Sequence, residues 1–84
     1  MTITVQLFAS LAEAAGARTV SLDDLPPGAT VADIAARLVD RFPRLAGLRA
    51  SVIYAVNAEY VQADFPVQPG DTVALIPPVS GGQA

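Results

Sequence analysis

Polar and apolar side chains alternate along residues 2–8, with Ile3, Val5 and Leu7 on one side of the chain. This period of two is typical of a strand that buries one face. Residues 17–22 alternate in the same way and are followed by turn-forming prolines and a glycine. The N-terminal region therefore predicts two strands, which can form a hairpin.

The alanine-rich residues 11–15 lie between these strands and predict a short helix. Ser10 is a residue type that caps helix N-termini, and Gly16 is the type that ends helices in the left-handed conformation. We therefore expect Ser10 to cap this helix and Gly16 to end it.

The main helix is predicted to begin after Thr30 and to end before Pro43. Thr30 followed by Asp33 resembles a capping box in which Asp replaces the usual Glu. The apolar residues that follow are spaced so that they share one helical face. They are Val31, Ile34, Ala35, Leu38, Val39 and Phe42.

The C-terminal half predicts three more strands. Residues 51–56 and 59–62 flank a tight turn at Asn57-Ala58, and residues 72–76 follow the turn-forming Pro69-Gly70-Asp71.

One amphipathic helix over a mixed sheet, with the first and last strands adjacent near its centre, is the simplest arrangement of these elements. We expect an α+β fold of the β-grasp (ubiquitin-like) type for residues 1–76, followed by an extended tail at residues 77–84.

The composition narrows the chemistry. The 84 residues are 52% hydrophobic and 15% charged, which fits one globular domain. Cysteine, histidine and lysine are absent, so thiolate nucleophiles, imidazole bases, Schiff-base lysines and the usual soft metal ligands are missing. We therefore expect no metal site, no bound cofactor and no catalytic residue.

The five basic residues are all arginines and the net charge is −3, a balance that argues against binding to nucleic-acid phosphates. The N-terminal residues do not resemble a signal sequence, and no window approaches the roughly 20 apolar residues of a membrane span. We expect a cytoplasmic protein whose partners include neither nucleic acid nor a membrane.

Four aspartates could suggest paired-carboxylate chemistry, but each has a simpler explanation. Asp64 and Asp71 lie in predicted turns, Asp33 caps the main helix, and Asp40 lies on its solvated face. We interpret all four as structural.

Three apolar residues fall on the face of the predicted sheet that points away from the helix. Alternation along the first and last strands places Phe8 and Ile76 there, and Tyr60 in the short return strand can join them. A cluster of this kind among threonines is typical of a docking surface. The alternative is that Phe8 covers the sheet edge and the others are separate exposures, which are common on protein surfaces.

The C-terminal residues are the most specific feature. Pro77 and Pro78 exclude a helix and limit strand pairing, so the segment that ends at Gly82 is expected to extend about 20 Å at about 3.3 Å per residue. Gly81 and Gly82 lack side chains, so a narrow channel can admit them and a reagent can approach the Gly82 carbonyl closely. The alternative is a frayed end, where small residues are common.

Taken together, these features resemble the small, sulfur-carrying subunit of molybdopterin synthase and the related MoaD/ThiS-like sulfur carriers. The resemblance covers essentially the whole chain, and the double proline with the Gly-Gly pair is its most specific part. It rests on Phe8-Ala9 after the first strand, the capped main helix, Ala55-Val56-Asn57, Pro69-Gly70-Asp71 and Pro77-Pro78-Val79-Ser80-Gly81-Gly82.

The resemblance implies that Gly82 bears the sulfur. In this family an E1-like adenylyltransferase uses ATP to adenylate the glycine carboxylate, and sulfur then replaces the adenylate. The thiocarboxylate donates its sulfur to cyclic pyranopterin monophosphate in the large subunit of the synthase, a heterotetramer. The residues that would insert into the large subunit are Gly81, Ser80, Val79 and Pro78, and those that would contact both partners are Phe8, Tyr60 and Ile76.

Gln83 and Ala84 depart from the family's ending, because an amide bond and not a carboxylate follows Gly82. The chain can be a precursor that a metalloprotease trims after Gly82, the start of a longer or fused chain, or a protein with another role. We favour the precursor.

Other functions stay open. One is a sulfur carrier for thiamine, cysteine or thio-tRNA synthesis, which co-purification with the synthase large subunit would distinguish. Another is a ubiquitin-like protein modifier, which would form covalent adducts on target lysines. The last is a β-grasp interaction module whose activity does not need the glycine pair.

Overall fold

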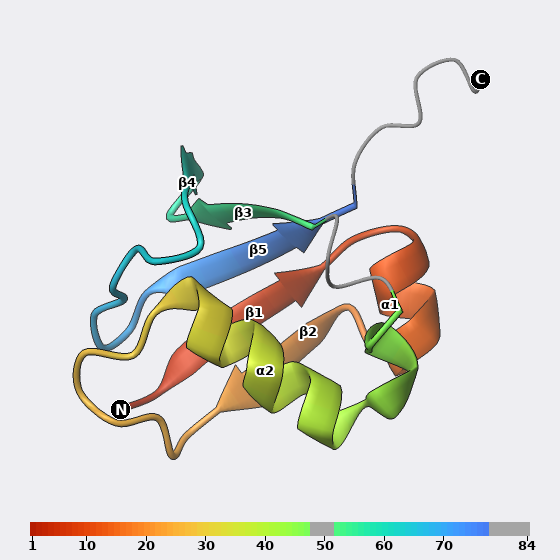
Figure 1. Cartoon of the computed structure of the whole chain (residues 1–84), viewed down its shortest axis with the longest axis horizontal. Coiled ribbons are helices and arrows are strands. Elements are labelled where there is room, and N and C mark those ends of the chain that lie inside the picture. The colour runs from red at the N-terminus through yellow and green to blue at the C-terminus, as the bar shows by residue number, and fades with distance from the viewer. Residues whose placement is uncertain (48–51, 78–84) are drawn as a thin grey trace.

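The computed structural model describes residues 1–47 and 52–77. Five strands form one sheet in the order β2-β1-β5-β3-β4, and α2 lies across one face of it (Figure 1). This arrangement confirms the predicted β-grasp fold. The elements in chain order are β1 (Ile3–Leu7), α1 (Ser10–Ala15), β2 (Thr19–Leu22), α2 (Val31–Arg41), a 3-10 turn (Pro43–Leu45), β3 (Ile53–Val56), β4 (Glu59–Val61) and β5 (Thr72–Ile76).

The first and last strands form the centre of the sheet, as predicted. β1 and β5 run parallel, with Val5 opposite Val73. β2 pairs antiparallel with β1 on one side, and β3 pairs antiparallel with β5 on the other, followed by β4. The chain therefore leaves the sheet at the end of a central strand.

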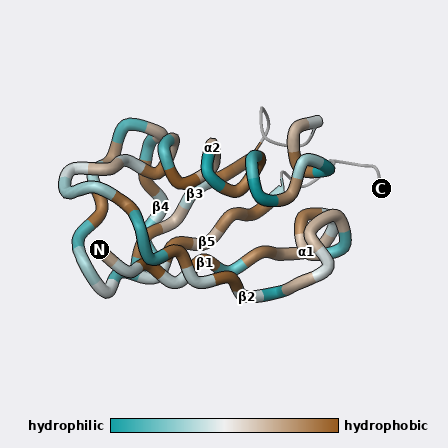
Figure 2. The backbone as a smooth tube through the Cα atoms, turned by 90° about the horizontal axis from the view of Figure 1, so that it is seen from below, coloured by the Kyte–Doolittle hydropathy of each residue, from teal (hydrophilic) through white to brown (hydrophobic). Residues whose placement is uncertain are grey.

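The core lies between α2 and the sheet, where Figure 2 shows apolar segments facing one another. The inward residues of the two central strands are at most 3% exposed: Ile3, Val5, Leu7, Val73 and Leu75. From α2 the buried residues are Val31, Ile34, Ala35 and Leu38. Val39 and Phe42, which were predicted on the same helical face, are only partly buried and pack against the margin of the core.

The N-terminus of α2 forms the predicted capping box. The Thr30 side-chain oxygen accepts a hydrogen bond from the Asp33 N–H (3.3 Å), and the Asp33 carboxylate accepts one from the Thr30 N–H (2.9 Å). The first two helical N–H groups donate to the carbonyls of Phe65 and Ala63. Because these N–H groups already have acceptors, the N-terminus of α2 does not offer them to a bound anion.

The prediction that Ser10 caps α1 is wrong. Ala9 holds the N-cap position with φ 49° and ψ −124°, no side chain caps the helix, and Ser10 is the first helical residue. The Leu11 N–H donates to the Phe8 carbonyl (3.0 Å), so a tight turn leads from β1 straight into the helix and provides an acceptor without a serine side chain. Gly16 ends α1 in the left-handed conformation (φ 74°), as predicted.

Four strands are shorter than predicted: β1 by one residue at each end, β2 and β3 by two residues at the start, and β4 by one residue at the end. Ser51, which was predicted to begin the third strand, lies outside the described residues. Pro43 ends the main helix as expected, but it also begins a 3-10 turn that the sequence pattern did not predict.

The tight turn between β3 and β4 is confirmed. Asn57 (φ 50°) and Ala58 (φ 72°) both adopt positive φ, as a two-residue hairpin turn requires. The Asn57 side chain accepts a hydrogen bond from the Thr72 N–H (3.1 Å) and donates one to Asp71 (3.0 Å). These bonds fasten the hairpin to the start of β5, and they compensate for the unfavourable backbone of Ala58.

Candidate partner interface

No helix covers the sheet face opposite α2 in the part of the chain that the structure describes (Figure 2). Along β1 the outward residues are Thr4, which is half-buried, and Gln6, which is exposed. A polar sheet surface of this kind can face water without a second layer of helices or strands packed on it. The apolar side chains of this outer face gather at one end of the sheet.

Phe8, Ile76 and Ile53 form a row across three neighbouring strands. Ile53 is directly opposite Ile76 in the register of β3 and β5. The Phe8 N–H donates to the Leu75 carbonyl (3.3 Å), which continues the pairing of β1 with β5 and places Phe8 beside Ile76. Phe8 is 45% exposed and Ile53 40% exposed, whereas Ile76, between them, is half-buried.

Tyr60 lies in the next row, at the β4 edge. It is opposite Ala55, which is in turn opposite Ala74 of β5. Tyr60 is 79% exposed, the largest exposure among the big apolar residues of the described chain. Ala55 and Ala74 are small, so no large side chain stands on the sheet surface beside Tyr60. We call Phe8, Ile53, Tyr60 and Ile76 together the outer-face patch.

The three predicted interface residues, Phe8, Tyr60 and Ile76, thus share one face, and their role in binding partners stays a prediction. Sequence reasoning missed Ile53. Alternation along the third strand could have revealed it, because Tyr54 and Val56 face α2 and the residue before them must face outward. Phe65 is also 40% exposed, but it lies in the loop before β5 and does not belong to the patch.

The patch borders the point at which the chain leaves the sheet. β5 ends at Ile76, a patch residue, and the half-buried Pro77 follows it. The residues predicted to enter a partner, Pro78, Val79, Ser80, Gly81 and Gly82, lie outside the described residues, as do Gln83 and Ala84.

The four aspartates are placed as structural residues. Asp33 completes the capping box, and Asp71 accepts a hydrogen bond from the Gln68 N–H (2.8 Å) within the turn before β5. Asp40 and Asp64 are exposed. Among residues 1–47 and 52–77, no group of three or more acidic side chains is arranged to hold a metal ion.

The described helices include none that is long and apolar enough to cross a membrane. The compartment in which the protein works stays a prediction.

Comparison with known proteins gives matches over nearly the whole chain. The model of the ThiS family matches residues 5–82. A molybdopterin synthase sulfur carrier subunit of Arabidopsis thaliana is 40% identical, with 95% of this chain and 82% of the relative aligned. The human protein of the same name is 36% identical, with 95% of this chain and 93% of the relative aligned.

A solved structure shows the same fold. The crystal structure of SAMP1 from Haloferax volcanii, whose full name is small archaeal modifier protein 1, superposes with a TM-score of 0.86. The two proteins share 36% sequence identity, and the superposition covers 98% of this chain and 100% of the archaeal chain.

Proposed function

Because the chain belongs to the ThiS family, we propose that it is the sulfur-carrier subunit of a molybdopterin synthase and that the carboxylate of Gly82 carries the sulfur. The observation that carries this proposal is the extent of the family match, which ends at residue 82, the second residue of the glycine pair. The names of the plant and human relatives support the choice of pathway.

The proposed chemistry takes place in the active sites of partners. In the E1-like activating enzyme, the Gly82 carboxylate attacks the α-phosphorus of ATP and pyrophosphate leaves. Hydrosulfide then attacks the acyl adenylate, AMP leaves with the acyl-bound oxygen, and a thiocarboxylate results. The chain binds no cofactor of its own, since ATP enters with the activating enzyme.

The role of this chain is to position the Gly82 carboxylate in the active site of each partner. The outer-face patch docks on a partner, and the residues after Pro77 extend into its active site. Because Gly81 and Gly82 have no side chains, the large subunit can bring cyclic pyranopterin monophosphate close to the sulfur. Phe8, Tyr60 and Ile76 serve both partners in turn, and the heterotetramer contains this chain together with the large subunit.

A free carboxylate at Gly82 is essential to this chemistry. An amide carbonyl lacks the oxygen nucleophile that attacks ATP, so a chain that continues into Gln83 cannot be adenylated there. Processing after Gly82, for example by a metalloprotease, must therefore precede the first step.

Reconstitution with the activating enzyme, ATP, a sulfur source and the large subunit tests the proposal. The chain ending at Gly82 is expected to convert cyclic pyranopterin monophosphate to molybdopterin. The chain retaining Gln83-Ala84 and the chain lacking Gly81-Gly82 are expected to give no product. Equal product from the chain that retains Gln83-Ala84 would contradict the role of Gly82.

The likeness to small archaeal modifier protein 1 supports a second candidate function, attachment of the chain to other proteins through the same carboxylate. An affinity-tagged chain, isolated from its own cells under denaturing conditions, distinguishes the two. A protein modifier gives higher-mass adducts joined through Gly82 to target lysines, whereas a dedicated carrier gives only the free chain.

A further inference from the structure

Among the residues that the structure describes, β2 pairs with β1 on one side only, so the sheet has an open edge at β2. The Leu7 N–H donates to the Arg18 carbonyl (2.8 Å), which fixes the alternation of backbone groups along this strand. By that alternation the backbone groups of Thr19 and Ser21 point away from β1. Their N–H and C=O groups therefore form the edge.

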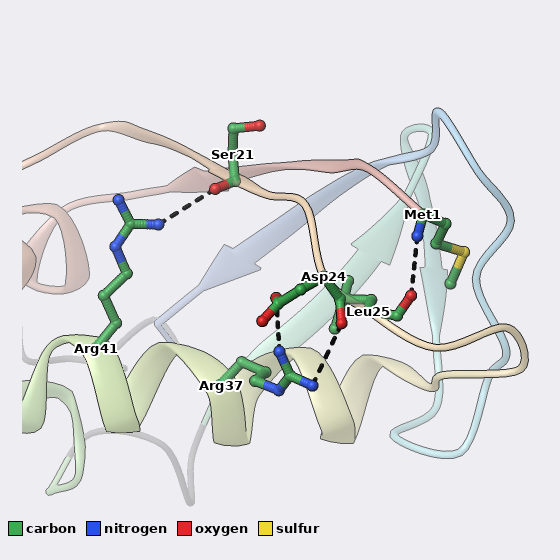
Figure 3. Close-up of polar contacts among 6 residues, drawn as sticks. All are labelled: Met1, Ser21, Asp24, Leu25, Arg37 and Arg41. Carbon is green, nitrogen blue, oxygen red and sulfur yellow. Dashed lines mark hydrogen bonds and ion pairs between the residues drawn. The ribbon is translucent and has the colours of Figure 1, made fainter.

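The edge retains hydrogen-bonding capacity. The Ser21 carbonyl accepts a hydrogen bond from Arg41 of α2 (3.2 Å; Figure 3), but a carbonyl oxygen can accept two. Within residues 1–47 and 52–77, the outward N–H and C=O of Thr19 have no partner. β2 contains no proline and no charged residue, and its register with β1 is continuous, so of the usual protections of an edge strand only its shortness and the Arg41 contact are present.

Opposite charges lie at the two ends of this strand. The exposed Arg18 precedes it, and the exposed Asp23 and Asp24 follow it. Asp24 is paired with Arg37 (2.6 Å; Figure 3), and Asp23 accepts a hydrogen bond from the Ser21 hydroxyl (3.3 Å). A strand with this distribution is complementary to an antiparallel copy of itself, because each positive end meets a negative end.

We propose that β2 is an interface between two copies of this chain, which pair antiparallel about Val20 and join their sheets. Thr19 of each copy then lies opposite Ser21 of the other, and each such pair exchanges both backbone hydrogen bonds. Arg18 has the parity of the inward residues Val20 and Leu22, so it lies on the helix side of the joined sheets, where Asp24 at the acidic end of the other strand is within its reach. The exposed Thr19 and Ser21 side chains also meet across the interface.

The association is weak. A pair of four-residue strands buries much less than the roughly 1,200 Å² of a stable interface, so we expect a weak dissociation constant, on the order of 0.1–1 mM. β2 and β4 are the two opposite edges of the sheet, so pairing through β2 leaves the outer-face patch exposed. The proposal is therefore independent of the sulfur-carrier function.

Sedimentation velocity and amide NMR of the full chain, from micromolar to millimolar concentration, test the proposal. The sedimentation coefficient is expected to rise, and concentration-dependent shifts are expected at Thr19–Leu22 but not at Ile53 or Tyr60, on the far side of the sheet. Thr19→Pro removes an outward N–H without touching the β1 pairing, so it should weaken association at least about tenfold. Thr19→Val keeps the N–H and should associate like the wild type.

A charge exchange gives a second readout that does not depend on the proline variant. Arg18→Glu is expected to weaken association about fivefold, and Arg18→Glu combined with Asp24→Arg is expected to restore it. The proposal is overturned if the chain stays monomeric at millimolar concentration or if Thr19→Pro, with an unchanged fold, associates like Thr19→Val. Concentration-dependent shifts confined to the outer-face patch would overturn it as well.

Discussion

The two faces of the sheet use the same alternation for different purposes. Under α2, Val5 and Val73 are completely buried, and packing accounts for their apolar character. On the other face, Phe8 and Tyr60 are 45% and 79% exposed, and the fold of the chain alone does not require them. Single exposed apolar residues are common, but a group of them on one face is typical of a surface that another protein covers. We therefore expect the inner face to determine stability and the outer face to determine docking on partners.

The largest expected effect is on the inner face. Ile34→Ala should lower the free energy of unfolding by about 2–5 kcal/mol, because Ile34 is fully buried and truncation leaves a cavity. Urea denaturation measures the loss. Val39→Ala, at a partly buried position of the same helix, is the matched control and should cost less. Equal losses for the two variants would contradict the placement of the core.

Tyr60→Ala should weaken partner binding without lowering stability, and so distinguish the outer face from the inner face. Its expected cost is about 2 kcal/mol of binding free energy toward the large subunit, since exposed aromatic residues often dominate interfaces. Stability should change by no more than about 0.5 kcal/mol, because the ring is outside the core.

Calorimetric titration with the large subunit measures this loss of affinity, and Phe65→Ala is the control. Phe65 is an exposed aromatic residue outside the outer-face patch, so its truncation should leave binding unchanged. If Phe65→Ala and Tyr60→Ala weaken binding equally, the patch is not the docking surface.

A smaller effect is expected at the capping box, which positions α2 over the inner face. Thr30→Ala should reduce stability by about 1 kcal/mol, because the Asp33 N–H loses its acceptor. Thr30→Ser retains a hydroxyl and should restore most of the loss. Thermal unfolding of the three proteins tests this, and an Ala variant as stable as the Ser variant would show that the cap contributes nothing.

The smallest effect is expected at the ion pair between Arg37 and Asp24. The two side chains are 38% and 80% exposed, so solvent screens the pair despite its 2.6 Å separation. Arg37→Ala should change stability by about 0.2–1 kcal/mol at low salt and by less at high salt. Urea denaturation at two salt concentrations measures the difference, and a larger loss that salt does not reduce would contradict this estimate of the pair.

The sequence predicted the elements whose side chains repeat with a fixed period. The alternation in β1 and the helical spacing in α2 are sufficient to identify most of the core. The same alternation, continued to Phe8 and Ile76, shows that these two residues lie on the outer face. Core residues in irregular segments, such as Leu25 and Val67, have no period, and only the folded chain shows that they are buried.

Two local errors have physical causes. Ser10 is a good capping residue, but the preceding turn at Ala9 supplies an acceptor from the Phe8 carbonyl and makes a serine cap unnecessary. Alternation along its own strand places Ile53 on the outer face, but its position beside Ile76 follows only from the register of β3 with β5, and the pairing of distant strands is not visible in either segment alone. The role of Gly82 came from the resemblance and not from local periodicity.

The central claim is that Gly82 carries sulfur, and intact mass spectrometry of the protein purified from the cells that make it tests this most directly. The account predicts a species that ends at Gly82, a fraction of which has one carboxylate oxygen replaced by sulfur. A protein that always retains Gln83 and Ala84 and never carries sulfur would contradict the account.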